Sequence, residues 1–194
     1  MRKQAWAFLL IGFLAGFGTL YTWTKKRAPD VVRAIPLPVD ERRTESSSAP
    51  PVDMARVQQL QAEVKNNPKN VEAFVELANI HFEQKNYKEA IGFYTKAVEL
   101  RPSNVNVRTD LATALFYENR FDDAISQFKK SLEMDPKNPR ALFNMGVTML
   151  HGKNDPDACL QYWEKLVEFN PDFPQVEFVR EQIRILRERQ KGRG

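Results

Sequence analysis

A sequence period of 34 residues restricts the fold of this chain more than any other feature. Pro68, Pro102 and Pro136 lie 34 residues apart, and a fourth proline follows 35 residues later. A period of this length is typical of proteins in which one supersecondary unit recurs and buries its apolar face against the next unit. The units that the prolines define superimpose column by column, and they cover residues 71–104, 105–138 and 139–172.

The superimposed units place the same kinds of residue in the same columns. Two columns hold small residues, which allow paired helices to approach closely, and two hold large residues, which fill the space between consecutive pairs. Each proline ends a helix because it lacks an N–H donor and clashes with the preceding turn. The columns are Leu77, Leu111 and Met145; Ala78, Ala112 and Gly146; Ala90, Ala124 and Ala158; and Tyr94, Phe128 and Tyr162.

These columns resemble the tetratricopeptide repeat (TPR). The pattern of that family runs from a large residue through Leu-Gly or Leu-Ala, an aromatic residue, alanine, a second aromatic residue and alanine to proline. The second unit departs from it at Arg108, which replaces the first large residue. The resemblance implies an all-α fold, a TPR solenoid of three helical hairpins. The first unit matches the pattern at Phe74, Leu77, Ala78, Tyr87, Ala90, Tyr94, Ala97 and Pro102.

The third unit is one residue longer than the other two, because Pro171 follows Pro136 by 35 residues. We expect the extra residue in the second helix of this unit, around Tyr162 and Trp163. A π-bulge or a lengthened exit turn would absorb it there. The last columns of the unit would then be displaced by one residue.

Segments on both sides of the three units also have helical patterns. Residues 53–70 match a lone second helix, which predicts an N-terminal cap of half a repeat. Residues 173–194 contain apolar positions at helical spacing and end in a basic tail, which predicts a C-terminal cap helix such as repeat arrays require. The apolar positions of this cap are Val176, Val179, Ile183 and Leu186.

The chain before the repeats begins with an apolar run. Residues 5–23 carry no charge and, as a helix rising about 1.5 Å per residue, would cross most of a ~30 Å hydrocarbon core. We expect residues 1–27 to form one N-terminal transmembrane helix with basic flanks; a cleaved signal peptide and a buried core helix are the alternatives. Gly12 and Gly16 have the spacing of a helix-dimerisation motif, which would allow a homodimer through the anchor.

Residues 28–52 contain five prolines and three consecutive serines, a composition typical of an extended linker. The short basic N-terminus resembles a signal anchor, which would place the repeats in the periplasm of a bacterial cell. Four cations after the run outnumber the two before it, Arg2 and Lys3, and favour the opposite orientation; the four are Lys25, Lys26, Arg27 and Arg33. We expect a single-pass protein of the bacterial inner membrane with a periplasmic repeat domain. A cytoplasm-facing adaptor of an organelle or secretion complex is the alternative.

Charge and composition argue against most other functions. The net charge is +4, but residues 53–172 carry more acidic than basic side chains, which argues against a nucleic-acid-binding protein. The single cysteine, Cys159, excludes an intrachain disulfide and a thiolate zinc cluster. We expect Cys159 and His81 to be structural residues. The sequence contains no recognisable catalytic or metal-ligand motif, so we expect no catalytic residue, metal or cofactor; an enzyme with an unrecognised site is the weaker alternative.

The TPR resemblance also implies a binding surface. In this family the first helices of successive repeats line a concave groove, and we expect an extended hydrophobic peptide or an amphipathic helix as the partner. Phe143→Glu should then abolish partner capture while leaving the melting temperature nearly unchanged. The alternative is that Phe82, Phe116 and Leu150 pack between helices. The implied groove residues are Val75, Asn79, Phe82, Asn106, Thr109, Thr113, Phe116, Tyr117, Arg140, Phe143, Val147, Leu150 and His151.

Two finer resemblances concern the partner. Chaperone adaptors of the family clamp a C-terminal carboxylate with lysine, arginine and asparagine, for which only Asn79 and Arg140 are counterparts. Val75 replaces a lysine and Asp110 would repel an acidic tail, so we expect no chaperone-tail binding. The blocks VRTDLATALFY, ALFNMGV and YWEKLVEFNP are similar to TPR subunits of bacterial cytochrome c maturation, which implies a function in envelope or cytochrome c assembly.

Overall fold

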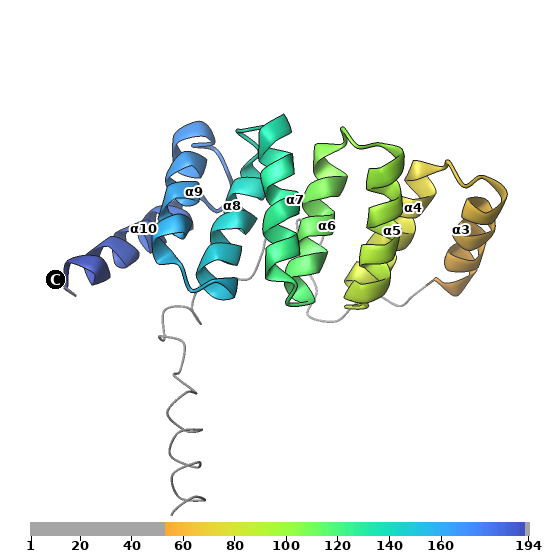
Figure 1. Ribbon diagram of the computed structural model, residues 1–194, viewed down its shortest axis with the longest axis horizontal. Helices are drawn as coiled ribbons and strands as arrows, with labels where there is room; N and C mark the ends of the chain where they lie inside the picture. The colour runs from red at the N-terminus through yellow and green to blue at the C-terminus, as the bar shows by residue number, and fades with distance from the viewer. Residues whose placement is uncertain (1–52, 193–194) are drawn as a thin grey trace, which may run out of the picture. The chain divides into compact units, whose positions relative to one another are not determined.

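The computed structural model describes residues 53–192, and this part of the chain consists of eight α-helices, a π-helical turn and no strands (Figure 1). The predicted anchor (1–27) and linker (28–52) lie outside the described residues. None of the described helices is long and apolar enough to span a bilayer. The elements are α3 (Met54–Asn66), α4 (Val71–Glu83), α5 (Tyr87–Leu100), α6 (Val105–Tyr117), α7 (Phe121–Met134), α8 (Pro139–Val147), the π-helical turn η2 (Thr148–Gly152), α9 (Pro156–Phe169) and α10 (Val176–Lys191).

The first helix of each hairpin begins at an asparagine that lies two residues after a proline. The side-chain oxygens of Asn70, Asn104 and Asn138 accept hydrogen bonds from backbone N–H groups three residues later, at 3.1, 3.2 and 2.9 Å. Such a cap satisfies one of the backbone donors that a helix start leaves open and stabilises the helix by ~1 kcal/mol. The repeated Pro-x-Asn sequence therefore ends one helix and starts the next.

Each hairpin turns at a residue with left-handed backbone geometry. Lys85, Asn119 and Asn154 have φ angles of 62°, 60° and 53°. In the first two hairpins the residue after this position donates a backbone hydrogen bond across the turn, Asn86 to His81 and Arg120 to Leu115, at 2.8 and 2.9 Å. Asparagine tolerates left-handed geometry better than lysine does, so the first turn carries the most strain.

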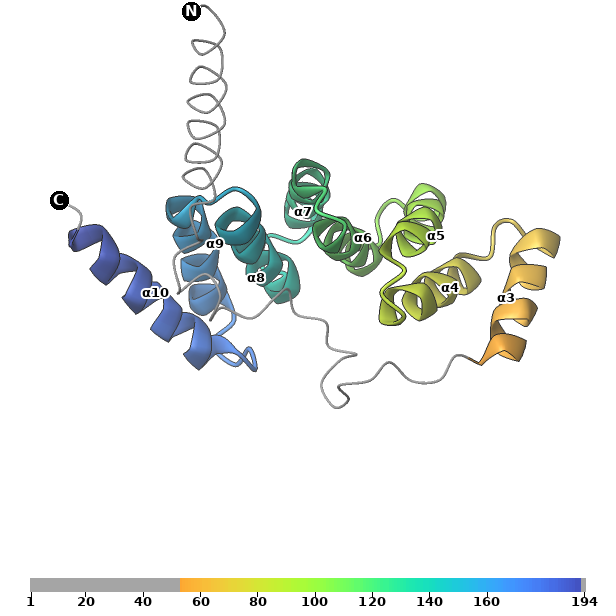
Figure 2. The same cartoon turned by 90° about the horizontal axis from the view of Figure 1, so that it is seen from below.

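The hairpins α4–α5, α6–α7 and α8–α9 stand side by side between the terminal helices α3 and α10 (Figure 1). Seen from below, α4, α6 and α8 lie along one side of the row, and α5 and α7 lie along the other (Figure 2). We call the surface made by α4, α6, α8 and the turn η2 that continues α8 the first-helix face. Small buried residues such as Ala78 and Ala90 bring the two helices of a hairpin together.

The third hairpin corrects the predicted position of the extra residue. Trp163 and Cys159 are fully buried, whereas Tyr162 and Ala158 are only half-buried. Trp163 and Cys159 therefore take the places that Tyr94 and Ala90 hold in the first hairpin. The extra residue lies before α9 rather than inside it, because the π-helical turn η2 uses more residues per turn at the end of the first helix.

The two terminal helices cover the ends of the row. Helix α3 packs Val57 and Leu60 against Ala73 and Leu77 of the first hairpin. On α10, the stripe seen in the sequence is the buried face, and Arg184 on the solvent side pairs with glutamates one turn away in both directions, at 2.6 Å. Helix α10 thus has one apolar and one charged side, whereas the exposed side of α3 is mostly uncharged, with Gln58, Gln59 and Gln61. Both helices cover an apolar end of the row, as a cap does.

Candidate functional site: the first-helix face

The first-helix face carries the thirteen residues that the sequence implied for a groove, but they differ in exposure. Seven are buried and form a floor, five are half-buried, and Asn106 is exposed. The buried residues are Phe82, Thr109, Thr113, Phe116, Phe143, Val147 and Leu150. The half-buried residues are Val75, Asn79, Tyr117, Arg140 and His151.

Phe143 is a core residue, and the expectation that it faces an open groove is wrong. Its side chain is 0% exposed. Its ring lies 5.9 Å from the ring of Trp163 and 5.9 Å from that of Phe173, and its backbone carbonyl accepts a hydrogen bond from the Trp163 indole. A glutamate here would bury a carboxylate among aromatic rings, so Phe143→Glu should unfold the third hairpin instead of leaving melting unchanged. Phe82, Phe116 and Leu150 are buried as well, in agreement with the alternative that they pack between helices.

Aromatic rings gather where the first two hairpins turn. The rings of Tyr87 and Tyr117 are stacked, with centroids 4.9 Å apart and planes 12° from parallel. Phe82 meets Tyr117 edge-on at 5.6 Å, and Phe116 contacts Phe121 at 5.6 Å. Aromatic pairs of this geometry stabilise by ~0.5–1.5 kcal/mol beyond the area they bury. The cluster joins the first two repeats and leaves Tyr87 and Tyr117 half-buried at the surface.

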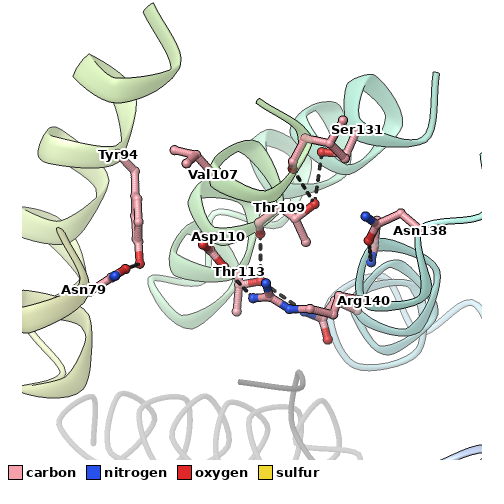
Figure 3. A network of polar contacts seen from close by, with 12 residues as sticks. Asn79, Tyr94, Val107, Thr109, Asp110, Thr113, Ser131, Asn138 and Arg140 are labelled. Atoms are coloured by element: carbon pink, nitrogen blue, oxygen red, sulfur yellow. Dashed lines mark hydrogen bonds and ion pairs between the residues drawn. The ribbon is translucent and has the colours of Figure 1, made fainter. Parts of the chain in front are cut away.

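An ion pair between α6 and α8 joins the second repeat to the third (Figure 3). Arg140 donates to the carboxylate of Asp110, and the two side chains are only 17% and 12% exposed. A buried pair of this kind is costly to break, because either partner alone is left as an unpaired charge. The pair therefore fixes the position of α8 against α6.

Neutral hydrogen bonds continue this polar network. Asn144 donates to the hydroxyl of Thr113 at 3.1 Å, and Thr113 donates to the backbone carbonyl of Thr109 at 2.9 Å. Thr109 and Ser131 hydroxyls lie 3.3 Å apart across the second hairpin (Figure 3). The hydroxyls of the two buried threonines thus bond to backbone carbonyls of their own helix and to side chains of the neighbouring helices, and they do not point to solvent.

The two counterparts of a carboxylate clamp are both engaged within the fold. The side-chain oxygen of Asn79 accepts a hydrogen bond of 2.6 Å from the hydroxyl of Tyr94, and Arg140 pairs with Asp110 (Figure 3). Val75 supplies no positive charge. The expectation that the face does not hold a chaperone tail stays a prediction.

Histidine and cysteine offer little chemistry in the described part of the chain. His151 lies in η2, and its Nε2 atom is buried without a hydrogen-bond partner among the described residues. Burial lowers the pKa of His151 and favours the neutral ring. Burial and the nearby Asp155 raise the pKa of the Cys159 thiol, which suppresses the thiolate. His81 stacks on Phe93 with ring centroids 5.3 Å apart. Within residues 53–192 no three His, Cys, Asp or Glu side chains converge on a metal site.

Two features of the structure were not anticipated from the sequence. Tyr87 matches a column of the repeat, but the pattern gave no sign that it stacks on Tyr117 of the next repeat. Arg108 stood out as a departure from the pattern, and the structure buries it between helices, with 9% of its surface exposed. The departure from the repeat pattern at Arg108 was visible in the sequence, but the burial of its side chain was not predictable from it.

This arrangement of helices defines a helical-repeat protein whose hairpins follow one another in a row. Two models of the tetratricopeptide repeat match the chain, over residues 69–137 and 109–174. The chain belongs to the tetratricopeptide repeat family. Domains of this family are protein–protein interaction scaffolds, and this chain has that architecture. No curated protein sequence matches the chain.

Solved structures with the same fold come from several proteins. A crystal structure of MamA has a TM-score of 0.58 at 16% identity, covering 71% of this chain and 88% of that chain. The first TPR of Spaghetti (RPAP3), bound to the HSP90 peptide SRMEEVD, has a TM-score of 0.56 at 21% identity, with coverage of 62% and 93%. The Arabidopsis OM64 TPR domain has a TM-score of 0.54 at 20% identity, with coverage of 59% and 93%. These likenesses establish the fold.

Proposed function

We propose that the first-helix face binds an extended peptide or a helix of a partner protein. The observation that carries this proposal is the row of half-buried side chains on α4, α6 and α8 above a tightly packed floor. Val75 and Asn79 lie on α4, Tyr117 ends α6, Arg140 lies on α8, and His151 follows in η2. A partner segment that crosses the three repeats would meet an apolar, an amide and an aromatic group, then the Asp110–Arg140 pair and an imidazole.

The physical properties of this row suit a peptide. The ring of Tyr117 in this row is already held by stacking on Tyr87 of α5, so little side-chain entropy is lost when a partner packs on it. The floor is fixed by the buried Asp110–Arg140 pair and the hydrogen bonds around Thr113. A preorganised surface binds with a smaller entropic cost than a mobile one.

The RPAP3 domain supports the class of partner, because its structure contains a bound HSP90 peptide. It does not support that particular peptide here. The one cation among the counterparts of a carboxylate clamp, Arg140, is already paired with Asp110, and Val75 is uncharged.

We further propose that residues 5–23 hold the repeats at a bacterial inner membrane, with residues 28–52 as the linker and the repeats in the periplasm. The charge-free run and its basic flanks support this proposal. Envelope or cytochrome c assembly is the process that the similarity of the blocks in the second and third repeats suggests. The alternative is a cytoplasm-facing adaptor. Protease treatment of sealed vesicles separates the two, because only repeats on the inside of the vesicle are protected.

A matched pair of substitutions tests the proposed binding face. Asn106 on α6 and Ser126 on α7 are both exposed, polar and uncharged, but only Asn106 lies on the first-helix face. We expect Asn106→Arg to reduce recovery of the in-cell partner, whereas Ser126→Arg should leave recovery unchanged. Each change should alter the free energy of unfolding by no more than ~0.5 kcal/mol, since both sites are on the surface. Equal recovery with both variants would contradict the proposal.

A further inference from the structure

Arg108 on α6 is a buried cation without a carboxylate partner among the described residues. Its side chain lies where the repeat pattern has a large residue, and it is 9% exposed. The Nη1 atom donates to the side-chain oxygen of Gln127 at 2.8 Å, and the Nη2 atom donates to the backbone carbonyl of Pro102 at 2.8 Å. The Nε atom is buried with no hydrogen-bond acceptor in residues 53–192. Both acceptors are formally neutral.

This environment compensates the charge only in part. Removing a cation from water is costly unless an opposite charge and a full set of acceptors replace the solvent. The carbonyl of Pro102 lies just beyond the C-terminus of α5, where the helix dipole provides a partial negative charge. That contribution is smaller than the one an anion would provide, and the Nε–H group is left unsatisfied.

A pocket of about 350 Å³ opens beside Arg108. It is bordered by α5, α6 and α7, away from the row of half-buried side chains on the first-helix face. We call it the Arg108 pocket. Its walls combine the polar pair Arg108 and Gln127 with the apolar side chains Ile91, Val98, Leu111 and Leu115.

Two acidic residues also line the pocket, but each has its own cation. Asp123 pairs with Arg120 at 2.7 Å, and Glu99 pairs with Lys96 at 2.7 Å. Arg108 is therefore the cation in this pocket that has no carboxylate partner among the described residues. The two acidic side chains also disfavour a ligand with two negative charges. A monoanion therefore fits the pocket better than a phosphate monoester does.

We propose that the Arg108 pocket binds a carboxylate on a short aliphatic stem. The stem packs against Leu111, Leu115 and their apolar neighbours, and the carboxylate replaces the Gln127 amide on the Arg108 guanidinium. A charged acceptor then takes the place of a neutral one, which strengthens the hydrogen bond. The carboxylate comes either from an acidic side chain of a partner segment or from a free organic acid, since both present the same chemistry.

Hexanoate is the probe for the first test, with hexanol and hexylamine as its neutral and cationic counterparts. In the 194-residue chain, we expect hexanoate to shift the Arg108 Nε–H resonance saturably, together with the methyl signals of Ile91 and Leu115. Hexanol should bind about tenfold more weakly, because it lacks the charge-assisted hydrogen bond. Equal shifts with hexanol, or shifts that do not saturate, would overturn the proposal without any mutation.

A matched pair of variants provides the second test. Arg108→Met keeps the length of the side chain and removes the charge, and Arg120→Met does the same at the rim of the same pocket. We expect the affinity for hexanoate to fall about tenfold or more in Arg108→Met and to change little in Arg120→Met. An unchanged affinity in a folded Arg108→Met protein would refute the role of Arg108. If that variant does not fold, the comparison of hexanoate with hexanol decides.

Two peptides identify the source of the carboxylate. Acetyl-Ala-Leu-Glu-Leu-Ala-amide carries it on a side chain between apolar residues, and the glutamine version of this peptide is its control. Tighter binding of the glutamate peptide than of hexanoate supports the proposal with a partner protein as the source. Binding of hexanoate alone supports it with a free acid as the source. Equal binding of the two peptides, with no saturable hexanoate signal, would contradict it.

Discussion

The indole of Trp163 occupies the space that a side chain on Gly146 would need. A Cβ atom at Gly146 would lie 2.3 Å from the indole Nε1 and 2.4 Å from Cδ1. The same indole donates a hydrogen bond of 3.1 Å to the carbonyl of Phe143, so it cannot move aside without losing that bond. The helices α8 and α9 therefore approach each other closely only because residue 146 is glycine.

Gly146→Ala should destabilise the domain although alanine is the better helix former. We expect a net loss of about 1 kcal/mol, because an overpacking cost of ~2 kcal/mol exceeds the ~1 kcal/mol gain in helix propensity. Gly92→Ala is the control, since nothing lies within 4 Å of a Cβ atom at that exposed position of α5. Gly92→Ala should stabilise by ~0.5–1 kcal/mol. Urea unfolding of both variants measures the change in the free energy of unfolding. A gain in stability at both positions would contradict the close packing of Trp163 on Gly146.

Lys85→Gly should stabilise the first hairpin. Lys85 has φ 62°, and this left-handed geometry costs an ordinary residue ~1–2 kcal/mol that glycine avoids. Glycine also loses more conformational entropy on folding, which offsets part of the gain in stability. We expect a net gain of ~0.5–1 kcal/mol. Asn119→Gly at the equivalent turn should gain less, since asparagine tolerates φ 60°. Thermal melts compare the two, and a larger gain at Asn119 would speak against backbone strain as the cause.

The Asp110–Arg140 pair should be strongly coupled. Asp110→Leu or Arg140→Met alone should cost ~3 kcal/mol, because each leaves one buried charge unpaired. The double variant should cost much less than the sum of the two, since it leaves no charge behind. A double-mutant cycle by denaturant unfolding measures the coupling. Additive losses would mean that the pair does not join the second and third repeats energetically.

His151 should make the stability of the domain fall at mildly acidic pH. Burial lowers its pKa in the folded chain below the ordinary value of 6.5. The unfolded chain then binds the proton more tightly, so stability is lost as the pH falls through the ordinary pKa and below it. Melting temperatures between pH 7.5 and 5.5 should decrease more in the parent protein than in His151→Gln. Parallel pH curves for the two proteins would rule out this contribution.

The hairpins were predictable because each unit has small and large residues at the same positions. In addition, Pro-x-Asn precedes every first helix. The register of the third hairpin was not predictable from column matching. Ala158 and Tyr162 are acceptable residues for the columns that Cys159 and Trp163 occupy, and only the π-helical turn decides between the two alignments.

The sequence was less informative about the binding face. Its pattern indicates which side of a first helix a residue occupies, but not how closely the neighbouring helices cover that side. Phe143 is covered by Trp163 and by Phe173 from the segment before α10, which belongs to no repeat. Tyr117, at the end of its helix, stays half-buried.

The most direct test of the central claim is a photo-crosslinking footprint in cells. A photoreactive residue is placed in turn at Val75, Asn106 and His151 on the first-helix face and at Lys96, Lys130 and Lys165 on the second helices α5, α7 and α9. We predict that one partner is trapped from the first three positions and not from the lysine positions. A partner trapped mainly from the lysine positions would contradict binding at the first-helix face.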